Sequence, residues 1–536
     1  MLRRRLVPAG AAPVRGAHGI AIALLTAGLL AHPLHAATLR FASAFDPQSM
    51  DPHGLALQYQ TRVVSQIYDS LVGRDRDFAL EPALALSWRA IDPTRWRFKL
   101  RPGVRFHDGT PFAADDVVFS ITRALAKNSQ RSFQLRGVVS ARKVDDLTVD
   151  LLLAAPDAVL PEKLVYVGIM SRAWATAHGV VEPQNYDAKQ ETYAVRHANG
   201  TGPFELKAYE SDARTVLVAN PHWWGSRGNV DEVIFSVIQS DATRLAALVS
   251  GQVDFVIDPP FQDVARLRQD GRFELVSMPD IGTQYLGFDQ GSHELRSSGV
   301  KGNPFQDLRV RRAVYQAIDI DSIVAKVLRG QAIAAGSYLS QRVDGSVADL
   351  DRRLPYDPAN ARALLSEAGY PDGFATTLDC VNVAFRAAVC QAIAGMLAQV
   401  GIRTRFQPWP TATFFPKLTQ ATTSFFEFGW SPGTDPWPML NALVHSRGAD
   451  GSGTFNGGRY ANPRLDRLIE AIRVEPDLSR RRRLVGDALR IMEADLPLIP
   501  LYRRTLTWAM RPDIHVAQWP NDVLELRFVE IGRSPQ

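Results

Sequence analysis

A short block in the first quarter of the chain constrains the fold more than any other part of the sequence. Residues 96–100 (WRFKL) alternate apolar and charged side chains, the period-two pattern of a half-buried strand. Pro102-Gly103 predicts a turn, after which residues 104–106 (VRF) resume the alternation. Further on, apolar residues recur every four positions, as on the buried face of a helix: Val117, Ile121 and Leu125. The block is therefore predicted to be a hairpin that leads into a helix.

The same residues carry a family resemblance. The sequence L-A-x-S-W at 84–88, followed by WRFKLRPGVRFHDGTPFAADDV at 96–117, resembles the signature of the family 5 extracellular solute-binding proteins. These proteins are peptide- and nickel-binding receptors of bacterial ABC importers. One departure is Ala113, where the family usually has a Thr or Asn helix cap. The missing capping hydrogen bond lowers the stability of the helix by about 1 kcal/mol.

Further motifs of this family extend the resemblance over essentially the whole mature chain: GTGPF at 200–204, NPHWWG at 220–225, DLRVRRA at 307–313 and EAGY at 367–370. GTGPF is not a phosphate-binding loop, because Pro203 removes a backbone donor and the Walker lysine is missing.

The resemblance implies an α/β fold of the large type II periplasmic-binding-protein class, in which two lobes close on the ligand as a clamshell. The expected organisation is a signal peptide at 1–36, the first lobe at 37–70, an extra subdomain of that lobe at 71–201, the first lobe again at 202–287, the second lobe at 288–504 and a return to the first lobe at 505–536.

The amino-terminal end predicts export. Three arginines, Arg3 to Arg5, precede an apolar run at 20–31 that is too short to span a bilayer but suits the core of a signal peptide. Small residues follow at Ala36 and Ala37, so cleavage is expected after Ala36, which gives a periplasmic protein. The alternative is an amino-terminal membrane anchor.

The charge balance argues against nucleic acid as a partner. The whole chain has 61 basic and 56 acidic residues, and removal of the four leader arginines leaves 57 basic residues. A nucleic-acid-binding protein normally has a basic face. The dense basic run here, 480–483, is interpreted as the exposed side of a helix.

No catalytic motif accompanies the fold signature. The chain contains no H-E-x-x-H or C-x-x-C sequence, and no two of its eight mature histidines lie within helical reach of each other. We therefore expect no catalytic residue, no metal and no cofactor. A catalytic triad scattered along the chain, as in a secreted hydrolase, is the alternative that spacing alone leaves open.

The chain has two cysteines, Cys380 and Cys390. Two cysteines can pair in an oxidising periplasm, and similar family members carry a pair at this spacing. The resemblance therefore implies a disulfide, and two buried free thiols are the alternative.

The ligand site is expected at residues 427–436 (EFGWSPGTDP), which resemble the second-lobe loop of peptide-binding members. In such receptors an aspartate three residues after the tryptophan pairs with the peptide's α-ammonium group, but this chain has Gly433 there. A buried ammonium group needs a charged or strongly hydrogen-bonding partner. Either Asp435 or Glu427 supplies it, or the ligand has no free ammonium group. A turn cap is the alternative role of Asp435.

Four aromatic residues are candidate walls of the ligand cleft: Trp430, Trp409, Phe45 and Tyr285. Plain packing is the alternative for the tryptophans.

The predicted function is that of a periplasmic, monomeric receptor that delivers peptides or peptide-like small molecules to an inner-membrane ABC permease. Receptors for a nickel chelate, an opine or a sugar are the alternatives within the class.

Overall fold

A computed structural model describes residues 37–295, 301–431 and 433–532. The predicted signal peptide and its cleavage site lie outside these residues. Among the described helices, none is both long and apolar enough to cross a lipid bilayer.

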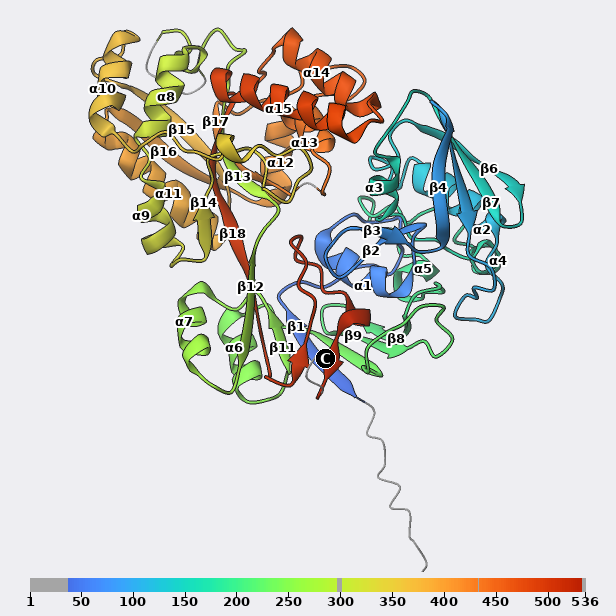
Figure 1. Cartoon of the computed structure of the whole chain (residues 1–536). Coiled ribbons are helices and arrows are strands. Elements are labelled where there is room, and N and C mark those ends of the chain that lie inside the picture. Colours follow the sequence, from blue (N-terminus) through green and yellow to red (C-terminus); the bar gives the residue numbers. More distant parts are fainter. Residues whose placement is uncertain (1–36, 296–300, 432, 533–536) are drawn as a thin grey trace, which may run out of the picture. The chain divides into compact units, whose positions relative to one another are not determined.

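One long strand belongs to both of the large sheets that frame the protein (Figure 1). This strand, β18, runs over Leu498–Met510. Its first part pairs with β13 (Thr283–Phe288) and β14 (Ala332–Ala334). Its second part pairs with β11 (Phe255–Ile257) and β12 (Glu274–Pro279). The described chain therefore has two lobes, and β18 is a continuous connection between them.

The first lobe combines the beginning of the described chain with its end. Its sheet has the strand order β8-β9-β10-β1-β11-β18, with β12 as a further partner of β18. The remaining strands are β1 (Thr38–Ser43), β8 (Phe204–Glu210), β9 (Arg214–Ala219) and β10 (Glu232–Val237). Its helices include α1 (Gln58–Ile67), α6 (Asp241–Val249) and α7 (Phe261–Gln269).

The second lobe has the strand order β16-β15-β17-β13-β18. Its own strands are β15 (Phe374–Val381), β16 (Ile402–Trp409) and β17 (Phe425–Trp430). Its helices include α8 (Leu308–Gln316), α10 (Pro358–Glu367), α11 (Ala384–Gln399), α12 (Thr411–Thr419), α13 (Trp437–Leu443), α14 (Pro463–Val474) and α15 (Leu478–Asp495).

The extra subdomain of the first lobe is built on a separate sheet with the strand order β4-β5-β7-β6. Its strands are β4 (Ala85–Asp92), β5 (Arg95–Leu100), β6 (Val138–Asp145) and β7 (Thr148–Leu153). The helix predicted from Val117 and Ile121 is α2 (Ala114–Leu125), and both side chains are fully buried against this sheet's core.

The predicted hairpin partner of β5 is wrong. Residues 104–106 form no strand, and the only ladder contact there is a single bridge between Arg105 and Pro111. β5 pairs with β4 on one side and β7 on the other. Because both edges of β5 are occupied, no edge is left for the segment that follows it.

The start of α2 compensates for the missing cap residue. Ala113 provides no side-chain acceptor, but the Asp116 carboxylate accepts a hydrogen bond from the backbone N–H of Ala113 at 3.0 Å. An acid in the first turn also interacts favourably with the helix dipole.

The chain crosses from one lobe to the other at two adjacent points. β18 switches partners between Arg504, which pairs with Ala332, and Thr505, which pairs with Pro279. The other crossing lies between β12 and β13, where Asp280 forms a 2.9 Å ion pair with Arg504. The predicted return to the first lobe at residue 505 coincides with the switch in β18, whereas the predicted boundary after residue 287 falls inside β13.

Cys380 on β15 and Cys390 on α11 are joined as a disulfide in the structure, and both are fully buried. The bond ties the end of a central strand to the helix that follows it, within the core of the second lobe.

We predict that Cys380→Ala combined with Cys390→Ala lowers the free energy of unfolding by about 2–3 kcal/mol, because closing a short loop removes entropy from the unfolded chain. Urea unfolding of the variant and the wild type measures this difference. Peptide mapping without reduction should find the two cysteines in one linked pair. Quantitative alkylation of both thiols in oxidised, unfolded protein would contradict the disulfide.

Candidate functional site

A cavity of about 320 Å³ lies between the two lobes. The first lobe contributes polar and aromatic side chains to its wall, among them Thr61, Arg74, Arg131, Glu162, Lys163 and Tyr166. The second lobe contributes the loop after β17 and the start of α13: Trp430, Ser431, Gly433, Asp435, Trp437 and Pro438. The loop singled out in the sequence therefore does line a cavity between lobes.

Direct contacts hold the two walls together beside this cavity. The hydroxyl of Thr434 donates a 2.8 Å hydrogen bond to Glu162 of α3 (Leu160–Leu164). The same carboxylate forms an ion pair with Arg74 on β2 (Val72–Arg74). The ammonium group of Lys163 lies 4.9 Å from the ring centre of Trp437. Charged groups of the first lobe thus meet polar and aromatic groups of the second.

Trp430 ends β17 and is half-buried in the cavity wall. Its ring packs edge-on against Phe455. The indole N–H groups of Trp430 and Trp437 are buried and have no hydrogen-bond acceptor among the described residues. Neither nitrogen is exposed to the cavity.

Asp435 lines the cavity, but its charge is already compensated. Its carboxylate forms an ion pair with Arg481 of α15 at 2.5 Å and accepts a 2.8 Å hydrogen bond from the backbone N–H of Trp437. Burial raises the pKa of the Asp435 carboxyl, and the charge of Arg481 opposes this effect. Both contacts of the Asp435 carboxylate are therefore with the protein, one with α15 and one with the first residue of α13.

Arg481 was missed by the sequence interpretation, which placed residues 480–483 on the exposed side of a helix. Arg480, Arg482 and Arg483 are exposed, but Arg481 is buried. The helical spacing contains the signal, because Arg481 precedes Val485 by four residues and Ala488 by seven, and both are buried.

Glu427 does not reach the cavity. It is fully buried on β17, and its carboxylate forms an ion pair with Arg386 of α11 at 2.8 Å. Burial raises the pKa of Glu427, while Arg386 lowers it. This placement corrects the predicted contact with a ligand ammonium group, because the period-two pattern of β17 turns Glu427 towards the helix layer.

The three other residues predicted to line the cleft do not line this cavity. Tyr285 is fully buried on β13, where its hydroxyl donates to the backbone oxygen of Tyr338. Trp409 is half-buried and donates a 2.7 Å hydrogen bond to Asp379. Phe45 is 57% exposed and stacks on Tyr59. Tyr285 is therefore corrected from a cleft residue to a core residue.

Gly433 faces the first lobe. A Cβ atom at this position would lie 3.7 Å from a guanidinium nitrogen of Arg74. An aspartate introduced here would therefore meet Arg74 as well as any ligand, which complicates a simple restoration of the family's acidic residue.

Arg131 is a further cavity residue that the sequence interpretation missed. It is 3% exposed, and no carboxylate in the described part of the chain pairs with it. Its guanidinium donates to Gln60 at 3.0 Å and to Thr61 at 2.7 Å, and its Nε has no partner. Burial lowers the pKa of Arg131 to about 10, so it remains charged at neutral pH. No motif marks this residue in the sequence.

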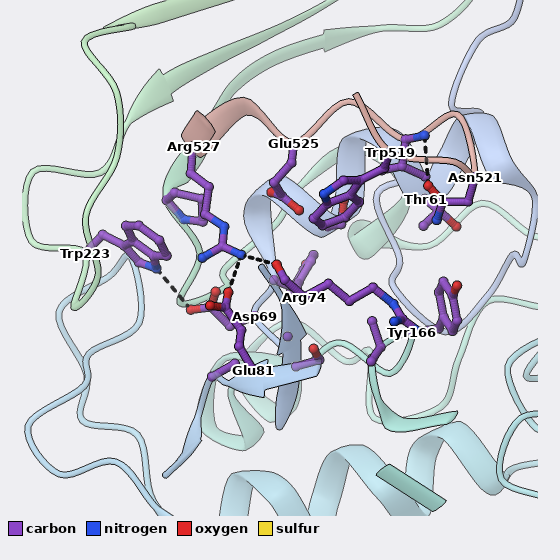
Figure 2. Close-up of a pocket in the computed structure, with 18 of the residues that line it drawn as sticks. Thr61, Asp69, Arg74, Glu81, Tyr166, Trp223, Trp519, Asn521, Glu525 and Arg527 are labelled. Atoms are coloured by element: carbon purple, nitrogen blue, oxygen red, sulfur yellow. Dashed lines mark hydrogen bonds and ion pairs between the residues drawn. The ribbon is translucent and has the colours of Figure 1, made fainter. Parts of the chain in front are cut away.

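A smaller cavity of about 80 Å³ adjoins the main one (Figure 2). The two share five lining residues: Thr61, Arg74, Tyr166, Asn521 and Val523. Acidic and aromatic side chains dominate the rest of its wall, with Asp69 and Glu525 on opposite sides of the space in Figure 2.

The described residues also bring Cys380, Cys390 and Glu427 together in a group whose ligand atoms lie within 4.8 Å of one another. The two sulfurs are bonded to each other, and Glu427 is paired with Arg386. This group therefore offers no open ligand set for a metal ion.

We predict that Asp435→Asn destabilises the unliganded protein by about 3–5 kcal/mol, because it leaves Arg481 buried without its counter-charge. Thermal and urea unfolding measure the effect. Asp487→Asn is the matched control, since its ion pair with Arg490 is exposed and such pairs contribute about 0–1 kcal/mol.

The double variant Asp435→Leu with Arg481→Met should recover most of this stability. An unchanged melting temperature for Asp435→Asn, together with lost ligand affinity, would instead show that the charge serves the ligand.

Comparison with known proteins identifies the family. The model of the bacterial extracellular solute-binding proteins, family 5 Middle, matches residues 79–451. The heme-binding protein A of Haemophilus influenzae is 29% identical over 466 residues, which cover 81% of each chain. The dipeptide-binding protein of Escherichia coli is 26% identical over 525 residues, which cover 91% of this chain and 94% of that one.

Solved structures share the fold. The periplasmic binding protein DppA of Helicobacter pylori, in complex with the peptide STSA, superimposes with a TM-score of 0.77 at 23% identity and covers 92% of this chain and 98% of its own. The two-lobe architecture, the cavity between the lobes and the family match over residues 79–451 agree. The chain belongs to family 5 of the bacterial extracellular solute-binding proteins.

Proposed function

We propose that this protein is a periplasmic receptor that binds a peptide or peptide-like solute between its lobes and delivers it to an inner-membrane ABC permease without altering it chemically. The observation that carries the proposal is the cavity of about 320 Å³ between the lobes, whose wall includes a buried arginine with no acidic partner among the described residues. Ligand pockets commonly have volumes of about 300–1,000 Å³.

The chemistry of the cavity wall supports a solute that carries a carboxylate. A buried guanidinium group is costly unless an anion or strong acceptors compensate it. The only acceptors of Arg131 in the described chain are a side-chain amide and a hydroxyl. Nη2 of Arg131 already donates to Gln60 and Thr61, so a carboxylate would pair with Nη1 and supply the missing counter-charge.

The remaining wall supports a solute with an amide backbone. The rings of Trp430 and Trp437 supply apolar surface against which a peptide can pack. Relatives named for a dipeptide and for glutathione agree with a peptide-like ligand. A nickel chelate, an opine and a sugar remain as comparison ligands for the binding tests.

The first test is identification of the solute. Mass spectrometry of ligand released from protein expressed in the periplasm should find a peptide-like molecule. The purified receptor, tested against peptides, chelates, opines and sugars, should gain about 2.7 kcal/mol of stability from its ligand at one hundred times its dissociation constant. If none of these compounds raises the melting temperature, the proposal is contradicted. Chemical turnover of a bound solute would also contradict it.

We predict that Arg131→Met reduces affinity for the solute by at least about thirtyfold, because removal of one partner of a desolvated charge pair costs about 2–5 kcal/mol. Isothermal titration calorimetry measures this loss. Arg89→Met is the control, since Arg89 is exposed on β4.

The melting temperature of unliganded Arg131→Met should be unchanged or higher, because the variant removes an uncompensated buried charge. A lower melting temperature with unchanged affinity would assign Arg131 a structural role instead.

A further inference from the structure

The small cavity beside the main one contains a buried carboxylate without a partner. Glu525 is 8% exposed, and neither oxygen of its carboxylate has a hydrogen bond or ion pair among the described residues. It directly precedes the short helix η4 (Leu526–Phe528), and its carboxylate points into the cavity in Figure 2. Buried carboxylates are normally paired, so this one requires an explanation.

The charges around the cavity do not balance. Arg527 is paired with Glu81, at 2.5 Å, and Arg74 is paired with Glu162. Among the described residues, the carboxylates of Glu525 and Asp69 form no ion pair, although the charge of Arg527 acts on both and Arg101 lies near Asp69 over the ring of Trp224. All three side-chain donors to Asp69, from Thr201, Trp223 and Trp224, bind the same oxygen, Oδ2. Its other oxygen has no hydrogen-bond partner among the described residues.

The rest of the wall suits an organic cation. Aromatic side chains surround the space: Tyr68, Tyr166, Trp223, Trp224 and Trp519. Cations are attracted to aromatic faces, and the rings of Trp223 and Trp224 already carry the guanidinium groups of Arg527 and Arg101. The five residues shared by the two cavities connect this wall directly to the proposed ligand site.

We propose that the small cavity is a subsite that binds an alkylammonium group of the solute, with Glu525 as its counter-ion and the free oxygen of Asp69 as a second acceptor. The inference rests on the proposed function, because it assigns the subsite to the solute bound in the main cavity. A volume of about 80 Å³ accommodates such a group but not a whole solute.

The subsite and Arg131 together define a class of ligand. Thr61 lines both cavities and accepts a hydrogen bond from Arg131. A solute that extends past Thr61 therefore meets positive charge on one side and negative charge on the other. The solute class is a zwitterion, which carries both an ammonium group and a carboxylate, as free peptides do.

The protonation of the subsite agrees with this assignment. Burial, reinforced by the negative charges of Asp69 and Glu81 and opposed by Arg527, raises the pKa of Glu525 to about 7. Burial likewise raises the pKa of Asp69 to about 6, against its hydrogen bonds from Trp224, Thr201 and Trp223 and the charge of Arg527. A bound ammonium group favours the ionised carboxylates, so binding near pH 7 should release protons. Affinity should fall as the pH drops below about 7.

The ammonium ion alone provides the first test. At about 100 mM, methylammonium chloride should raise the melting temperature of the wild type by about 1 °C or more over sodium chloride at equal ionic strength. Tetramethylammonium, with the same charge but a larger volume, should have no such effect. Glu525→Gln should lose the response, and Glu182→Gln, at an exposed position, should keep it. Equal melting temperatures in methylammonium and sodium chloride for the wild type would overturn the proposal.

Dipeptides locate the source of the ammonium group. Ala-Lys carries an α-ammonium and a side-chain ammonium group, Ala-norleucine lacks the side-chain one, and N-acetyl-Ala-Lys has an acetamide in place of the α-ammonium group. Loss of the group that occupies the subsite should weaken binding by at least about tenfold, and Glu525→Gln should abolish this difference. If all three bind equally well, the subsite assignment is wrong while the peptide receptor stands. If none binds, the proposed ligand class fails, and the methylammonium experiment still decides the subsite.

The unliganded protein distinguishes a binding role from a structural one. The pKa of Glu525 is raised from 4.5 to about 7 in the folded state. The contribution of this residue to the free energy of unfolding therefore falls as the pH rises from 4.5 to about 7. Glu525→Gln should therefore melt at a higher temperature than the wild type at pH 8 while binding the ammonium group less well. A lower melting temperature at pH 8 would show that the carboxylate supports the fold and would overturn its assignment as a counter-ion.

Discussion

The pairing of β18 with strands of both lobes is the constraint on which the rest of the structure depends. A single strand that changes partners between Arg504 and Thr505 sets the position of each sheet relative to the other. The second crossing is bonded to β18, because the backbone N–H of Asp280 donates to the backbone oxygen of Arg504 and its carboxylate forms an ion pair with the Arg504 side chain. Two neighbouring strands allow the lobes to bend towards each other but resist their separation.

Compensation of buried charge then separates structural groups from candidate ligand groups. Asp435 and Glu162 line the cavity between the lobes, Glu427 lies in the interior of the second lobe, and each of the three has an arginine partner. Arg131 and Glu525 are buried to a similar degree and have none among the described residues. Because desolvating an unpaired ion costs several kcal/mol, we infer that a ligand supplies the missing charge at these two groups. The distinction depends on the partners of a residue and not on its type.

The sequence predicted local elements better than it predicted the partners of side chains. The period-two pattern of β5 and the period-four pattern of α2 correspond to observed elements, because each depends only on which face is buried. The proposed strand at 104–106 does not, since strand pairing depends on which edges remain free.

The ligand residues were harder still to predict. Trp430 lies in a loop with a recognisable motif, and the structure does bring it to the cavity wall. Arg386 and Arg481, which neutralise Glu427 and Asp435, are 41 and 46 residues away along the chain, and no local pattern joins either pair. Arg131 and Glu525 have no motif at all. Their significance lies in the absence of a partner within the described chain, which only a three-dimensional arrangement reveals.

The shared strand also has a consequence for the order of folding. β12 has no partner except β18, and β11 has one free edge until β18 arrives. The strand that completes the first sheet is made after the whole second lobe. The first lobe, although synthesised first, therefore stays open at one edge until nearly all of the chain has emerged, and it must close its longest-range contacts last. A chain built in this way cannot complete its first lobe until its last segments are available.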